Sequence, residues 1–97
     1  MARSGDPSVS DTTFALTGEL DLHRADQLEA GLRRHAERAA DPVIIDCSEL
    51  TFIDSSGLGM LVEIHNETGK RLHLQHVSEG CRKIFVLTGL DTMFELS

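Results

Sequence analysis

The chain has 97 residues, enough for one domain with a modest core, and 40% of them are hydrophobic. Its formal net charge of −7 disfavours nucleic acid and anionic membranes as partners and favours a partner with a basic face. No stretch approaches the roughly 18 apolar residues of a membrane-spanning helix, and the first residues lack the apolar segment of a signal peptide. We therefore expect a cytoplasmic protein.

The first predicted elements are a flexible leader and a strand. Residues 1–11 are small and polar, which is typical of a flexible leader, and we expect the folded domain to span residues 12–97. Residues 12–17 place Phe14 and Leu16 on one side, and this alternation predicts a strand with one apolar face. The strand is predicted to end at the polar residues that follow it.

A helix, a buried strand and a second helix follow. Residues 24–39 carry apolar side chains at helical spacing, which predicts an amphipathic helix that residues 41–42 end. Residues 43–47 form an unbroken apolar run rich in β-branched side chains, which is typical of a fully buried strand. The apolar spacing that follows predicts another helix, which begins after Ser56, runs to about Thr68 and is closed by Gly69.

The last third of the chain repeats this alternation. Residues 71–77 predict a strand with one wetter face, and Ser78 is expected to begin a helix that Gly89 ends. The tail is expected to pack three apolar side chains onto the sheet: Leu90, Met93 and Phe94. Strands that alternate with helices imply parallel pairing, so we expect a small α/β domain with a mixed, mostly parallel sheet of about four strands packed by helices.

The residues with reactive side chains do not form a recognisable catalytic or metal site. Cys47 lies in the buried strand and Cys81 on the apolar face of the third helix, so both are expected to be core residues rather than a disulfide or metal ligands. The histidines lack metal-binding spacing. The serines lack the Gly-x-Ser-x-Gly elbow of a hydrolase, and the glycines lack the pattern of a phosphate-binding loop. We expect no cofactor, no metal and no enzymatic activity.

Residues 54–57 (Asp-Ser-Ser-Gly) lie where the buried strand ends and the second helix begins. Asp54 or Ser55 can cap this helix, and Gly57 allows a partner to approach the hydroxyl of Ser56 closely. A phosphate on Ser56 would be stabilised by the N-terminus of the helix but would lie near the carboxylate of Asp54. The alternative is a loop that caps the helix and does nothing else.

Three segments resemble one protein family. Residues 52–59 (FIDSSGLG) resemble the signature of the STAS domain of bacterial anti-sigma factor antagonists, residues 18–21 (GELD) resemble its second signature, and residues 86–94 (VLTGLDTMF) resemble its closing segment. They occur in the family's order and cover roughly residues 12–96. The chain is therefore identified as a member of this family, with a small STAS-type fold.

The resemblance implies a partner-switching function. The unphosphorylated protein would bind an anti-sigma factor serine kinase, which would then release its sigma factor. Phosphorylation of the serine directly before the glycine, here Ser56, would abolish this binding. A phosphatase would remove the phosphate from Ser56 and so reset the switch. The resemblance implies that six residues take part in partner binding: Asp21, Asp54, Ser55, Ser56, Gly57 and Leu58. The alternative function is a STAS scaffold subunit of a stress-sensing or transport complex, without a phosphorylation cycle.

Asp21 has two interpretations. Carboxyl ends of parallel strands lie at one edge of a sheet, so residues 18–21 and 50–57 are expected to share that edge. The resemblance implies that Asp21 contacts a basic residue of the kinase at this edge. A helix cap is an equally supported alternative. Leu58 likewise either supplies an apolar contact or anchors its helix.

Overall fold

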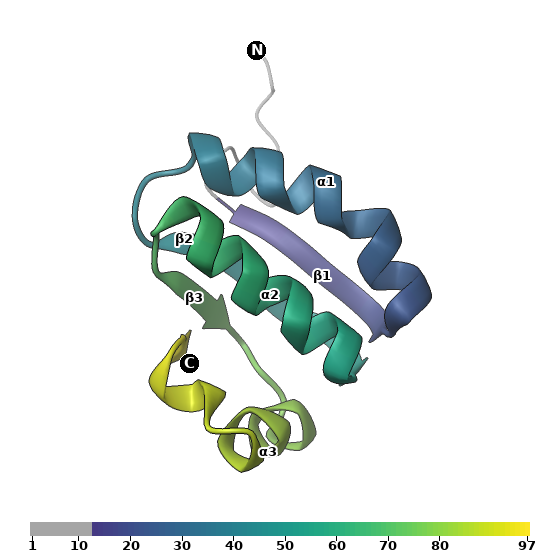
Figure 1. Cartoon of the computed structure of the whole chain (residues 1–97). Helices are drawn as coiled ribbons and strands as arrows, with labels where there is room; N and C mark the ends of the chain where they lie inside the picture. The colour runs from purple at the N-terminus through teal and green to yellow at the C-terminus, as the bar shows by residue number, and fades with distance from the viewer. Residues whose placement is uncertain (1–12) are drawn as a thin grey trace.

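A four-stranded sheet and three α-helices make up the described part of the chain, residues 13–97, in this computed structural model (Figure 1). The elements in chain order are β1 (Thr13–Leu20), α1 (Leu22–Arg38), β2 (Val43–Ile53), α2 (Ser55–Thr68), β3 (Leu72–Gln75), α3 (Glu79–Leu87), the short 3-10 helix η1 (Leu90–Thr92) and β4 (Glu95–Leu96). The predicted flexible leader, residues 1–11, and the boundary at residue 12 lie outside the described residues.

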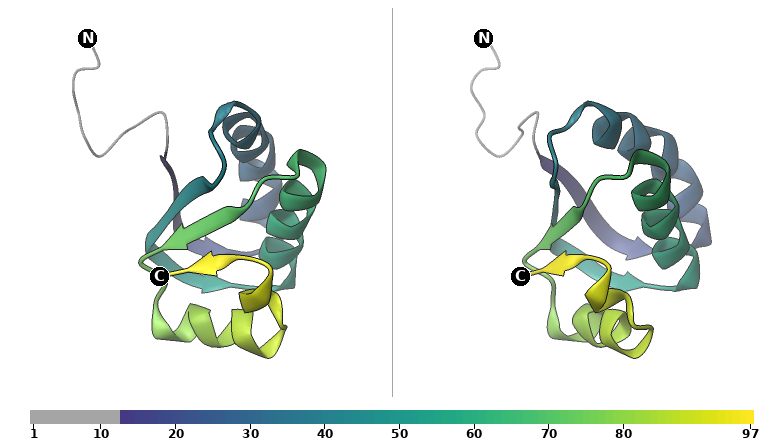
Figure 2. Two further views of the ribbon diagram at one scale, coloured as in Figure 1. Left: turned by 90° about the vertical axis from the view of Figure 1, so that its left-hand side faces the viewer. Right: turned by 60° about the vertical axis from the view of Figure 1, so that its left-hand side comes forward.

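The strands lie in the order β1-β2-β3-β4, and each neighbouring pair is parallel. The sequence predicted a small α/β domain of about four mostly parallel strands, and the structure confirms this, with parallel pairing throughout residues 13–97. Figure 2 shows α1 and α2 side by side over one face of the sheet, with α3 packed against β2.

The core lies between the sheet and the helices. Alternate residues of the strands point into it, as the sequence pattern predicted for β1. For β2 the prediction of a fully buried strand was wrong, because Val43, Ile45 and Cys47 are buried while Ile44 and Asp46 between them are only partly buried. The largest fully buried side chains are Phe85, Leu16, Leu20, Leu32, Ile45, Ile53, Leu61, Ile64, Leu72, Leu74, Val43 and Cys47. Both cysteines are free and buried, as predicted, and burial raises the pKa of the Cys47 thiol to about 12.

Two strands are longer than their sequence pattern indicated. β1 continues to Leu20 and β2 to Ile53, beyond the predicted ends at residues 17 and 47. The pairing of β1 with β2 contains two shifts in register, and each shift breaks the simple alternation of inward and outward side chains. The longer strands carry their ends directly to the first turns of α1 and α2.

The tail after α3 packs two of its three predicted apolar side chains. Phe94 is buried and lies edge-on to Phe85 and His65, with ring centroids 6.1 and 6.0 Å apart. Leu90 is partly buried. The prediction was wrong for Met93, which is 37% exposed because its neighbour Phe94 takes the inward position.

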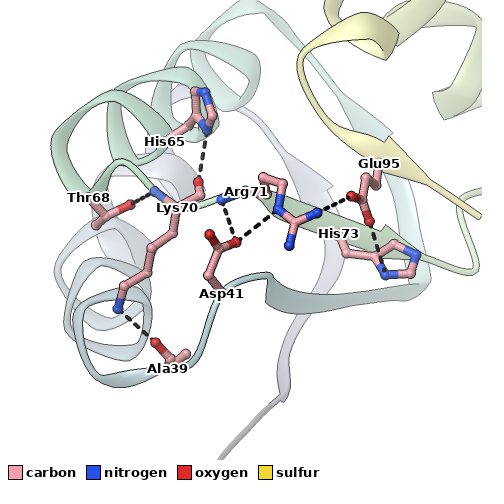
Figure 3. A network of polar contacts seen from close by, with 8 residues as sticks. All are labelled: Ala39, Asp41, His65, Thr68, Lys70, Arg71, His73 and Glu95. Atoms are coloured by element: carbon pink, nitrogen blue, oxygen red, sulfur yellow. Dashed lines mark hydrogen bonds and ion pairs between the residues drawn. The ribbon is translucent and has the colours of Figure 1, made fainter.

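Lys70 lies in the loop that follows α2, and its side chain caps the C-terminus of α1 (Figure 3). Its ammonium group donates three hydrogen bonds, to the backbone carbonyls of Ala36 at 2.7 Å, Glu37 at 2.9 Å and Ala39 at 2.7 Å. Carbonyls at a helix C-terminus lack partners inside the helix and form the negative end of its dipole. A cation at this position therefore stabilises α1.

Asp41 and Arg71 join the segments that lead into β2 and β3 (Figure 3). The carboxylate of Asp41 accepts hydrogen bonds from the backbone N–H and the Nε of Arg71, both at 3.1 Å. The pKa of Asp41 lies below its usual value, mainly because its carboxylate accepts the hydrogen bond from the backbone N–H of Arg71. Arg71 also pairs with Glu95 of β4 at 3.2 Å. These contacts lie at the N-terminal ends of the strands.

Candidate functional site

The first turn of α2 stands at the C-terminal end of β2, and Asp54 caps it. Asp54 has an extended backbone (φ −112°, ψ −172°), and its Oδ1 accepts hydrogen bonds from the backbone N–H groups of Ser56 at 2.9 Å and Gly57 at 3.2 Å. The predicted cap is confirmed and assigned to Asp54 rather than Ser55. Two of the free N–H groups of the helix are thus satisfied within the chain.

The end of β1 lies directly against this turn. The backbone N–H of Asp54 donates to the carbonyl oxygen of Leu20 at 3.2 Å, so residues 18–21 and 50–57 share one edge, as predicted (Figure 1). A Cβ atom at Gly57 would lie 2.8 Å from both the Leu20 carbonyl oxygen and Ile53 Cγ1.

Gly57 therefore serves a different purpose from the one that the sequence suggested. We expected its missing side chain to admit a partner to Ser56. Gly57 is instead buried, and atoms of Leu20 and Ile53 occupy the space around it. A glycine is required here because β1 and α2 approach each other closely.

Three neighbouring side chains of α2 differ in their access to solvent. Ser55 is exposed and Ser56 is partly buried. Leu58 is only 7% exposed and belongs to the core, so of its two predicted roles the structure favours anchoring the helix.

Asp21 caps α1 at the same edge of the sheet. Its backbone is extended (φ −99°, ψ −173°), and its Oδ1 accepts a hydrogen bond from the backbone N–H of Arg24 at 3.0 Å. The structure thus contains the cap that was one of the two interpretations of Asp21, and α1 begins at Leu22, two residues before its predicted start.

An open groove of about 740 Å³ runs along α2 from this edge. Its lining comes from α1, α2 and the segment after α3, and consists of Leu22, Ala25, Asp26, Glu29, Ser55, Ser56, Leu58, Gly59, Met60, Val62, Glu63, Asn66, Thr88 and Leu90. Asp54 and Asp21 lie outside this lining. The groove brings the two serines beside acidic side chains of α1 and α2.

Sequence reasoning missed the contribution of α1 to the groove. Leu22 is 62% exposed and precedes the predicted start of the helix. Asp26 falls among the polar positions of the amphipathic pattern, where a solvent-exposed residue is expected. The signal that could have placed them was Asp21 as a cap, because the first turn of α1 then faces the same edge as α2.

Residues 13–97 contain neither a recognisable metal site nor a helix that could span a membrane. No three His, Cys, Asp or Glu side chains in this part of the chain are grouped so that they could hold a metal ion. None of the helices in the same range has the length and apolar character needed to cross a membrane.

Comparison with known proteins gives a consistent result. The family described as "Mlab, STAS domain" matches residues 6–96. The anti-sigma-B factor antagonist of Bacillus subtilis (strain 168) is 31% identical over 91 residues, which cover 91% of this chain and 83% of that protein.

Two solved structures of SpoIIAA are also similar. The anti-sigma factor antagonist SpoIIAA in its unphosphorylated form superposes with a TM-score of 0.65 and 26% identity, over 92% of this chain and 82% of that one. The Bacillus cell fate determinant SpoIIAA in the phosphorylated form gives a TM-score of 0.63 and 30% identity, over 92% and 86%. With its fold, its two signature segments at one edge of the sheet and these matches, the chain belongs to the STAS domain family.

Proposed function

We propose that this domain is a cytoplasmic anti-sigma factor antagonist whose binding is switched off by phosphorylation on the first turn of α2. Unphosphorylated, it binds an anti-sigma factor serine kinase, which then releases its sigma factor, and a phosphatase resets the switch. The observation that carries the proposal is the pair of hydroxyls, Ser55 and Ser56, on a capped helix N-terminus that opens into a groove. The function named for the relatives supports it.

The arrangement around Asp54 explains how a phosphate would act. A phosphate adds about −1.5 to −2 charges at neutral pH, and a helix N-terminus stabilises such a charge. The carboxylate of Asp54 already accepts the N–H groups of Ser56 and Gly57, so fewer donors remain for the phosphate. The phosphate would therefore stay at the surface, where a partner fitted to a small hydroxyl meets a bulky dianion.

The acceptor is one of the two serines. The sequence-based proposal is Ser56. Ser55 is the alternative, and its greater exposure favours it, because a kinase must bring the hydroxyl into its own active site. Phosphopeptide mapping of the wild-type chain, Ser55→Ala and Ser56→Ala after incubation with the kinase separates the two. The variant that loses phosphate identifies the acceptor.

Asp21 is proposed to contact a basic residue of the kinase in addition to capping α1. Asparagine caps helices about as well as aspartate, so Asp21→Asn should fold with near wild-type stability while it loses the charge. Removing the charge of one partner from a pair that is buried in an interface can cost roughly 2–5 kcal/mol of binding free energy, so Asp21→Asn should bind the kinase more weakly. If the affinity of Asp21→Asn for the kinase equals that of the wild type, the role of Asp21 is the cap alone.

The test of the whole proposal is a binding titration with nucleotide present. The unphosphorylated chain, the phosphorylated chain and the two alanine variants are each titrated against the purified anti-sigma factors of the source organism, one at a time. Phosphorylation should weaken binding at least about a hundredfold, which corresponds to about 2.7 kcal/mol. Binding of all forms within a factor of three would refute the switch. Absence of both binding and phosphate transfer would favour the scaffold alternative.

A further inference from the structure

Gly59 occupies a position in α2 where the fold does not require a glycine. It lies one turn into the helix and is exposed, and a Cβ atom built there would meet no atom within 4 Å. Glycine inside a helix is less stable than alanine, because its backbone loses more conformational freedom on folding. Gly57, two residues earlier, is the opposite case, since a Cβ there would lie 2.8 Å from neighbouring atoms.

The space that Gly59 leaves open belongs to the groove over α2. Ser55 and Ser56 precede Gly59 by four and three residues, so the three lie on one side of the helix and line the groove together. Leu22 on one side and Leu90 on the other provide apolar walls. A partner lying in this groove could approach the backbone of α2 closely at Gly59, one helical turn from either serine.

The charge of the groove limits the chemistry of such a partner. Its lining contains three carboxylates, those of Asp26, Glu29 and Glu63, and no Lys, Arg or His. Arg33 neutralises part of this charge, since it pairs with Glu29 at 2.8 Å and approaches Glu63 at 3.9 Å, but it is also held by Glu67 at 2.7 Å. Within residues 13–97, Asp26 forms no ion pair.

We propose that the anti-sigma factor packs directly on Gly59 with a small apolar surface and directs a lysine or arginine at Asp26. This inference rests on the proposed function and adds to it the part of α2 that is covered and the chemistry of the covering surface. It also explains why a phosphate on Ser55 or Ser56 would block binding, because the phosphate would stand one turn from the point of closest approach.

The experiment compares matched variants in the full chain. Gly59→Ala and Gly59→Gln place a small and a long side chain in the groove. Gly80→Ala is the control, because Gly80 lies in α3, outside the groove, and a Cβ there also meets no atom within 4 Å. Asp26→Lys tests the charge, and Glu37→Lys makes the same charge change on α1 away from the groove. Each variant is titrated, unphosphorylated, against the anti-sigma factor that binds the wild-type chain, and its melting temperature is measured.

The expected result is a loss of affinity without a loss of stability. Gly59→Gln and Asp26→Lys should each bind at least tenfold more weakly, and Gly59→Ala should fall between Gly59→Gln and the wild type. Gly80→Ala and Glu37→Lys should bind within threefold of the wild type, and both alanine variants should melt at or above its temperature.

If the wild type binds and the Gly59 variants bind equally well, this inference is overturned while the proposed function stands. The same holds if Glu37→Lys weakens binding as much as Asp26→Lys, since only the overall charge would then matter. If the wild-type chain binds no anti-sigma factor of the source organism, the proposed function fails and the inference fails with it.

Discussion

Gly57→Ala should destabilise the domain, because the new methyl group has no space. Its Cβ would lie 2.8 Å from Ile53 Cγ1 and from the carbonyl oxygen of Leu20, and 2.9 Å from Leu20 Cγ. Both neighbouring side chains are buried, so neither can swing aside into solvent. Overpacking of this kind costs roughly 1–3 kcal/mol.

Two smaller effects modify this figure. Moving the Leu20 carbonyl weakens its 3.2 Å hydrogen bond from the N–H of Asp54, at a cost of about 0.5–1.5 kcal/mol. In the opposite direction, replacing a helical glycine by alanine stabilises the helix by about 0.5–1 kcal/mol. Because these two effects nearly cancel, the net loss stays at about 1–3 kcal/mol, which for a domain of this size lowers the melting temperature by roughly 4–24 °C.

The measurement is thermal unfolding of Gly57→Ala beside Gly59→Ala, which makes the same chemical change on the same helix where a Cβ meets no atom. Gly59→Ala should gain about 0.5–1 kcal/mol of stability. If Gly57→Ala melts at or above the wild-type temperature, the close approach of β1 to α2 does not hold in solution and the reasoning about this edge is wrong.

Three other predictions concern single side chains. Asp54→Ala should lose about 0.5–2 kcal/mol of folding stability because the cap is removed, and Asp54→Asn should keep most of that stability. Unfolding in urea measures both variants, and equal midpoints for the wild type and the two variants would contradict the cap. Cys47, whose thiol pKa is raised to about 12 by burial, should react with a thiol reagent at neutral pH far more slowly in the native chain than in urea, and equal rates would contradict its burial. The pKa of Asp41 is lowered in the folded state, so its contribution to stability is present above the ordinary value of 3.8 and is lost as the pH falls through the folded value. Asp41→Asn should therefore melt below the wild type at neutral pH, and the difference should shrink in acid; a constant difference across the pH series would show that the pairing with Arg71 does not depend on the charge.

The sequence predicted most of the elements because their signals are local. The second helix was expected to end at Gly69, and Gly69 does adopt the left-handed conformation that closes a helix (φ 69°). Ser78 was expected to begin α3, and its side chain accepts the backbone N–H of Cys81. Caps of this kind depend on residues three or four positions apart, which a single sequence displays.

The full length of β1 and β2 could not be predicted from periodicity. Two register shifts interrupt the pairing of β1 with β2, and they disturb the alternation of apolar and polar side chains between Cys47 and Ile53. The position of such shifts depends on the partner strand, which the local sequence does not display. Met93 was misplaced for a related reason, because only the packed tail determines which of two adjacent apolar residues points inward.

The two glycines of the signature show the same limit at the candidate site. Gly57 and Gly59 both lie in the first turns of the second helix, and both neighbour Leu58, so the sequence gives no packing reason to distinguish them. Only the position of β1 distinguishes them, since the Leu20 carbonyl fills the space at Gly57 and no atom fills it at Gly59. The contribution of α1 to the groove likewise depends on a contact between segments far apart in the chain.

The parallel order of the strands has a consequence for how quickly the domain can fold. Thr13 pairs with Ile44 and Val43 with Leu72, so in each case a whole helix separates the paired residues. No two adjacent strands within residues 13–97 are joined by a hairpin, and the sheet cannot begin to form from a local turn. Closing each long connection costs chain entropy before the strand contacts repay it. We expect the domain to fold more slowly than a helical bundle of its length, with helices forming early and the strands pairing only after the chain between them has closed.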